Sequence, residues 1–124
     1  MSFLRELLEK LARPPEDIRA ENLRHWSASI EGTTAISEVV PRQRVRAAGV
    51  VTNIRIDPRE GRGSIEATVV DGTGSMVAKW LGRAKLSGIR LGAGLVIEGL
   101  PGKQDGDLVV LNPEYELVPG PERG

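Results

Sequence analysis

The chain of 124 residues is long enough for one compact hydrophobic core and too short for two well-buried ones. It has 17 basic and 17 acidic side chains, which give a formal net charge of zero, and it has no cysteine. These counts exclude disulfides, thiolate nucleophiles and thiolate zinc sites. They leave His25 as the only imidazole, which we expect on the solvent side of a helix. We therefore expect no metal, no cofactor and no histidine-based catalysis.

Nothing in the sequence indicates a membrane protein or a secreted one. The first ten residues contain leucines, but Glu6, Glu9 and Lys10 interrupt them, so this segment lacks the apolar centre of a secretory signal. No apolar run approaches the roughly 20 residues that span a bilayer. We expect a cytoplasmic protein.

The charges are distributed unevenly along the chain. Residues 42–90 contain ten basic and four acidic side chains, a balance of +6, whereas residues 91–118 contain one lysine and five acidic side chains. Because contacts with phosphate need lysine and arginine, the first interpretation is a polarised surface with one basic side. The alternative is a mixed, solvated surface whose charges sort by sign only along the chain.

Two helices are predicted at the start of the chain. Residues 3–11 carry leucines at the i, i+3, i+4, i+7 spacing of an amphipathic helix, namely Leu4, Leu7, Leu8 and Leu11. Pro14 ends this helix, and a second one is expected over residues 15–27, because proline is tolerated in a first turn. We interpret the second helix as a lid on one mouth of the β-barrel that the rest of the chain is predicted to form. The alternative is a partner-binding or self-associating arm. Residues 31–38 are predicted to be a polar linker.

Five strands are predicted between glycine-marked turns, at residues 45–56, 64–70, 76–81, 95–100 and 108–117. Gly49 lies within the first strand, where a residue without a Cβ atom permits the bend by which one strand joins two sheets. In the second strand Ile65, Ala67 and Val69 alternate with polar residues, as in a half-buried antiparallel strand. We therefore expect a mainly β fold, a five-stranded Greek-key barrel over residues 39–118, with a helical extension at 1–38 and a flexible tail at 119–124.

The acidic residues between the strands have conformational explanations. Residues 71–75 read as a hairpin turn between two strands, where neither a dinucleotide-binding loop nor a Walker loop occurs. Asp57, Asp105 and Asp107 also fall in predicted turns, where aspartate is common. Since no positioned acid, base or nucleophile emerges, we expect a protein that is not an enzyme.

Several short runs in the predicted barrel resemble a known family. They are VRAAGVV at 45–51, VDGTG at 70–74, WLG at 80–82, GAGLVIEG at 92–99 and NPEYE at 112–116. The chain is similar in these runs to the oligonucleotide/oligosaccharide-binding (OB) fold family of nucleic-acid-binding proteins. It resembles the anticodon-binding domains of some aminoacyl-tRNA synthetases, the wedge domain of branch-migration helicases and small stand-alone OB proteins of actinobacteria. The resemblance covers about residues 42–118.

The resemblance implies a nucleic-acid-binding surface on the second and third strands, bordered by the loop after the first strand and the loop before the last. The residues at these places are Arg55, Arg59, Arg62, Lys79, Trp80, Arg83, Lys85 and Lys103. Single-strand binders also stack bases on aromatic rings, at roughly 1–3 kcal/mol per base. The predicted barrel contains only two rings, Trp80 and Tyr115, so we expect no extended stacking platform.

Strand parity decides the role of Trp80. If Met76, Ala78 and Trp80 point inward, Lys79 lies outside, whereas the opposite parity would bury Lys79 at a large cost in free energy. Parity thus favours a core Trp80, and stacking on a base is the alternative. Tyr115 is predicted to be an edge-packing ring with its hydroxyl in water.

Two functions follow from the sequence. The first is a non-catalytic module that binds single-stranded or structured nucleic acid weakly, with low sequence specificity, through arginine and lysine contacts to phosphates. The second is a protein-interaction adaptor that docks a partner through the barrel or through the leucines of residues 3–11. The sequence does not distinguish DNA from RNA as the ligand.

Overall fold

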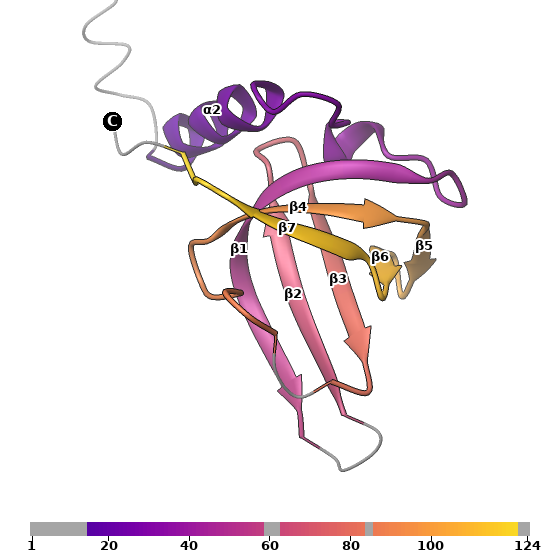
Figure 1. Ribbon diagram of the computed structural model, residues 1–124. Helices are drawn as coiled ribbons and strands as arrows, with labels where there is room; N and C mark the ends of the chain where they lie inside the picture. The colour runs from indigo at the N-terminus through magenta and orange to yellow at the C-terminus, as the bar shows by residue number, and fades with distance from the viewer. Residues whose placement is uncertain (1–14, 59–62, 84–85, 122–124) are drawn as a thin grey trace, which may run out of the picture.

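The computed structural model describes residues 15–58, 63–83 and 86–121 (Figure 1). Within these ranges the chain forms one α-helix, one short 3₁₀ helix and seven strands. Their bounds are α2 Pro15–Ala28, η1 Ile36–Glu38, β1 Val45–Asp57, β2 Ser64–Val70, β3 Ser75–Leu81, β4 Gly94–Gly99, β5 Pro101–Gln104, β6 Asp107–Leu111 and β7 Glu114–Val118. The mainly β class is confirmed. The helix predicted at residues 3–11 lies outside the described residues.

The seven strands form one sheet in the order β5-β6-β3-β2-β1-β4-β7. Neighbouring strands are antiparallel, except that β3 and β6 are parallel. The predicted last strand, residues 108–117, is divided into two strands. β6 pairs with β3, and β7 pairs with β4 at the other end of the strand order. A further strand, β5, was not predicted. The described strands therefore number seven rather than five, and their hydrogen bonds do not close the sheet into a barrel.

The last strand is divided at Asn112 and Pro113. Asn112 has a φ of 47°, which is left-handed backbone, and Pro113 has no N–H to give to a ladder. The N–H of Asn112 donates to the carbonyl oxygen of Lys79 at 2.7 Å, and the N–H of Leu81 donates to Asn112 Oδ1 at 2.9 Å. The connection between β6 and β7 is therefore hydrogen-bonded to β3 at Asn112.

β1 pairs with two different strands along its length, and it thereby joins the two halves of the sheet. Its first part pairs with β4 and its second part pairs with β2, and the two ladders meet at Val50. Gly49 lies beside this crossing, where a Cβ atom would be 2.8 Å from Val69 Cβ and 3.1 Å from the backbone N and O of Val70. The predicted bend at Gly49 is confirmed, and the close approach of β2 is a second reason for glycine there.

Alternation along β2 and β3 fills the core as predicted. The inward residues of these strands are at most 4% exposed, and they are Ile65, Ala67, Val69, Met76, Ala78 and Trp80. Leu86, Ile89 and Ala93 pack against this core from the connection between β3 and β4. The residues between the inward ones, by the same alternation, form one outer face across β2 and β3.

α2 packs on one end of the sheet. Arg24 Nη1 donates to the carbonyl oxygen of Gly72, in the β2–β3 turn, at 3.2 Å, and Trp26 Nε1 donates to the carbonyl oxygen of Pro119, just after β7, at 3.0 Å. Figure 1 shows α2 lying across this end, where the lid interpretation places it. His25 is exposed, as predicted. No helix of the described ranges is both long and apolar enough to cross a membrane.

The predicted polar linker, residues 31–38, is anchored in the core. Ile36 is 2% exposed, and its N–H donates to Oδ2 of the buried Asp71 at 2.9 Å. Oδ1 of the same carboxylate accepts hydrogen bonds from the N–H and hydroxyl of Thr73 and from the N–H of Gly74. Asp71 therefore shapes the predicted hairpin turn and also ties the linker to it.

Candidate functional site

Three strands place charged side chains in one row on the outer face. Arg55 of β1 is the register partner of Glu66 of β2, and Glu66 is the register partner of Lys79 of β3. Directly opposed residues of antiparallel strands point to the same side of the sheet. Because Ala67 and Ala78 point into the core, the row Arg55–Glu66–Lys79 lies on the outside.

The acid of this row lies between the two bases. Glu66 Oε2 is 4.0 Å from Arg55 Nη1, and Glu66 Oε1 is 3.9 Å from Lys79 Nζ. The side chain of Arg55 is 79% exposed, whereas those of Glu66 and Lys79 are 26% and 25% exposed. The row therefore presents one net positive charge rather than two, and it presents it mainly through Arg55.

Aliphatic side chains border the row on the β3–β6 side. In the parallel β3–β6 ladder Val77 is opposite Val109, and Lys79 is opposite Leu111. Leu111 is 55% exposed, and Leu81, two residues after Lys79 on the same face of β3, is 48% exposed. This part of the outer face is thus apolar around a single ammonium group.

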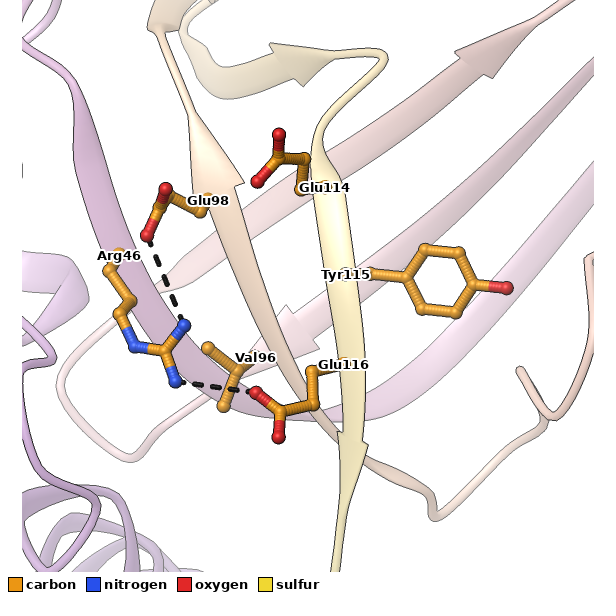
Figure 2. A pocket seen from close by; sticks show the side chains of 6 residues that line it. All are labelled: Arg46, Val96, Glu98, Glu114, Tyr115 and Glu116. Carbon is orange, nitrogen blue, oxygen red and sulfur yellow. Dashed lines mark hydrogen bonds and ion pairs between the residues drawn. The ribbon is translucent and has the colours of Figure 1, made fainter.

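A second group of ion pairs lies across β1, β4 and β7 (Figure 2). Arg44 Nη2 donates to Glu98 Oε2 at 2.9 Å, and Arg46 Nη2 donates to Glu116 Oε2 at 3.4 Å. Arg46 Nη1 also lies 3.9 Å from Glu98 Oε1, and Arg44 Nη2 lies 3.9 Å from Glu114 Oε2. Acidic residues of the segment 91–118 therefore neutralise two arginines of the basic segment 42–90.

These pairs correct the prediction of a polarised surface. The residues around Arg46 form a shallow hollow of about 160 Å³, lined by Arg46, Val96, Glu98, Glu114, Tyr115 and Glu116. Opposite charges that lie far apart in the sequence thus share one surface, because β1 pairs with β4 and β4 pairs with β7. In the part of the chain that the structure describes, no group of three or more His, Cys, Asp or Glu side chains could hold a metal ion.

Comparison with solved structures decides the fold. The chain is similar to the OB domain of MM0293 from Methanosarcina mazei, with a TM-score of 0.56 and 17% sequence identity, over 73% of this chain and 85% of that chain. The chain has an OB fold. Neither a family model nor a curated protein matches it.

Two further solved structures have the same fold in part of a longer chain. The p204 HINb domain matches with a TM-score of 0.54 and 16% identity, over 69% of this chain. RecG bound to a three-way DNA junction matches with a TM-score of 0.52 and 16% identity, over 90% of this chain. The OB chain described here spans 47% of the first of these chains and 16% of the second.

The OB fold explains the divided last strand and locates the outer face. An OB barrel is partly open and has five strands, so β6 and β7 together correspond to its fifth strand, with Asn112 and Pro113 as the break between them. The row of Arg55, Glu66 and Lys79 lies on β1 and on the second and third strands. The sequence correctly assigned Arg55 and Lys79 to this region.

Trp80 is not part of the outer face. It is 3% exposed, and its Nε1 donates to the carbonyl oxygen of Pro113 at 3.0 Å. The core interpretation is confirmed, and the alternative of stacking on a base is wrong because the ring is not accessible. Tyr115 packs edge-on against Trp80, with 5.5 Å between the ring centroids and 74° between the ring planes, and its hydroxyl donates to the carbonyl oxygen of Ser87.

Among the described residues, the predicted Arg83 and Lys103 do not join the row. Arg83 is exposed and follows the end of β3. Lys103 of β5 is the register partner of Leu108, which packs against the core, so it points to the opposite side of the β5–β6 hairpin from Val109. Its Nζ donates to the carbonyl oxygen of Gly106 at 3.4 Å. Three further predicted residues, Arg59, Arg62 and Lys85, lie outside the described residues.

Sequence analysis missed the role of Glu66. In the sequence Glu66 is only one of four acidic residues in the basic region 42–90, and nothing local places it between Arg55 and Lys79. The alternation of β2 puts Glu66 on the outside, which the sequence shows. Its two partners follow only from the register of three strands, which alternation does not fix.

Proposed function

We propose that the outer face of β2 and β3 binds single-stranded or structured nucleic acid, weakly and with low sequence specificity. The observation that carries the proposal is that Arg55 and Lys79 lie in one row, on either side of Glu66, on the face that OB folds use for oligonucleotides. The similarity to RecG, whose solved structure contains a three-way DNA junction, supports a nucleic-acid ligand.

Weak and unspecific binding follows from what this face contains. Phosphate contacts position a nucleic acid but do not read its sequence. In the described ranges the barrel rings, Trp80 and Tyr115, pack against one another rather than on this face. The ligand therefore forgoes the roughly 1–3 kcal/mol per base that stacking provides, and charge supplies most of its affinity.

A non-catalytic role is part of the same proposal. The buried carboxylate of Asp71 already accepts four hydrogen bonds, from Ile36, Thr73 and Gly74. It is therefore committed to the turn that it shapes. Glu66, on the outer face of β2, lies between Arg55 and Lys79 and is paired with both.

The test is fluorescence anisotropy with labelled single-stranded DNA and RNA at low and moderate salt. The informative variant is Arg55→Gln/Lys79→Gln. Its matched control is Arg44→Gln/Arg46→Gln, which removes the same charge from another part of the outer surface, over β1, β4 and β7. We expect saturable binding by the native protein that weakens with salt, with a slope of log affinity against log salt that falls by about 1 for each lost phosphate contact.

Only the first variant is expected to lose binding. The control variant should keep most of it, because Arg44 and Arg46 lie outside the outer face of β2 and β3 and form closer ion pairs, at 2.9 and 3.4 Å, with Glu98 and Glu116. An absence of binding at low salt, or an equal loss in both variants, would contradict the proposal.

A protein-interaction role for the same face is the second candidate, and the exposed Leu81 and Leu111 favour it. Apolar side chains surrounded by charge are typical of the centre of a protein interface. Leu81→Ser/Leu111→Ser separates the candidates. It should leave salt-dependent oligonucleotide binding largely unchanged if phosphate contacts dominate, and it should abolish capture of a protein partner if the leucines dominate.

A further inference from the structure

Glu66 occupies the place between two cations that a bridging phosphate would need. Its two carboxylate oxygens are directed one to each base, at 4.0 Å from Arg55 Nη1 and 3.9 Å from Lys79 Nζ. Both separations exceed the length of a direct hydrogen bond. The carboxylate therefore attracts both cations through charge alone, and a phosphate can replace it without breaking a hydrogen bond of the row.

We propose that Glu66 is an intramolecular competitor of the ligand phosphate for Arg55 and Lys79, and that it thereby sets the affinity of this face. The inference rests on the proposed nucleic-acid-binding function and deepens it by naming the residue that limits binding. A phosphate that approaches the row meets the attraction of two cations and the repulsion of one carboxylate. Removing the carboxylate should strengthen binding rather than weaken it.

Burial makes this competition effective. The side chains of Glu66 and Lys79 are only 26% and 25% exposed, so salt and water screen their interaction less than that of a fully solvated pair. Arg55 is 79% exposed and can reorient towards a ligand. We therefore expect Lys79 to be the cation that Glu66 neutralises most.

The chain provides a matched control on another part of the outer surface, over β4. Glu98 also lies beside two cations, Arg44 at 2.9 Å and Arg46 at 3.9 Å, and its side chain is 33% exposed. Glu66→Gln and Glu98→Gln are therefore the same substitution, with the same change of net charge and a similar environment. Only Glu66 lies on the outer face of β2 and β3.

The experiment measures the affinity of the whole protein for a labelled oligothymidine strand longer than the roughly 16 nucleotides that one OB fold covers at most. We expect Glu66→Gln to bind about threefold to tenfold more tightly at low salt, which is the range that one or two exposed ion pairs correspond to. The gain should shrink as salt rises. Glu98→Gln should bind like the native protein.

A third variant shows whether the gain passes through the cations. Glu66→Gln added to Arg55→Gln/Lys79→Gln should produce little gain, because the groups that the carboxylate neutralises are then gone. Circular dichroism and a urea titration of each variant establish that the fold is intact before binding is compared.

The outcomes separate the inference from the proposed function. If Glu66→Gln binds no more tightly than the native protein while Arg55→Gln/Lys79→Gln binds less, the face is correct and the competition is wrong. If Glu98→Gln gains as much as Glu66→Gln, only net charge matters and the inference is overturned. If no variant binds at low salt, the proposed function itself fails, and the inference fails with it.

Discussion

The indole N–H of Trp80 donates to the carbonyl oxygen of Pro113 at 3.0 Å, across the gap between β3 and the break in the last strand. The ring of Trp80 also meets Tyr115 of β7 edge-on. One buried side chain of β3 therefore holds both the break and the strand that follows it. No ladder joins β6 to β7. Trp80 therefore links β3 to the break and to β7 through a hydrogen bond and a ring contact rather than through strand pairing.

Trp80→Phe should destabilise the protein by about 1–3 kcal/mol, because it leaves the carbonyl of Pro113 without its buried donor. A urea titration followed by circular dichroism measures this loss. Oligonucleotide binding should not change, since Trp80 is only 3% exposed. A folded Trp80→Phe protein that no longer binds would contradict this prediction.

Trp26→Phe is the control for this prediction. Trp26 is half-buried and also donates its indole N–H to a carbonyl oxygen, that of Pro119, at the same 3.0 Å, but this hydrogen bond is exposed. Water can replace that donor, so we expect the cost to stay within about 0.5–1.5 kcal/mol. Equal costs for the two tryptophans would show that burial of the Trp80 hydrogen bond is not what matters.

Gly49→Ala should destabilise the fold by about 1–3 kcal/mol. The added Cβ atom would lie 2.8 Å from Val69 Cβ and 3.1 Å from the backbone of Val70, so β1 or β2 must shift. The comparison is Gly102→Ala in β5, where the added atom has only one neighbour, 4.0 Å away. Thermal unfolding of the two variants should show a lower midpoint for Gly49→Ala alone.

Local patterns account for the parts of the fold that the sequence predicted. Alternation assigned the inward residues of β2 and β3, including Trp80, because burying Lys79 without a partner would be costly. Gly49 marked the bend because a missing Cβ has a local meaning. These conclusions need no knowledge of which strands are neighbours.

Contacts between distant residues account for what the sequence did not predict. Arg46 and Glu116 are 70 residues apart in the chain, yet they are neighbours on one surface. The excess of basic residues in 42–90 and of acidic residues in 91–118 therefore does not correspond to a basic and an acidic surface of the folded molecule. In the same way Glu66 neutralises Arg55 and Lys79 only through the register of three strands.

Asp71→Asn should cost about 1–3 kcal/mol, although it preserves shape. Asp71 is 1% exposed, and its two oxygens accept from donors on two sides. An asparagine that keeps its oxygen towards Thr73 and Gly74 points its NH2 group at the N–H of Ile36, which then has no acceptor. Chemical denaturation measures the loss. Asp105→Asn, at an exposed position with a φ of 51°, should be nearly neutral.

Gly72→Ala should detach α2 from the sheet. A Cβ atom at Gly72 would overlap the carbonyl oxygen of Ala20 and lie 2.9 Å from Arg24 Cγ, so the helix must move away from the β2–β3 turn. The movement should also disturb the hydrogen bond from Trp26, in the last turn of the helix, to Pro119. Faster hydrogen exchange of the Trp26 indole N–H, observed by NMR, reports it.

Gly92→Ala separates this clash from backbone strain. Both glycines have a φ of +86°, so alanine at either position costs about 1–2 kcal/mol for the left-handed conformation. A Cβ at Gly92, however, meets no atom within 4 Å. The excess loss of stability in Gly72→Ala over Gly92→Ala therefore measures the docking of α2. If the two variants lose equal stability and Trp26 exchanges equally slowly in both, α2 does not act as a lid.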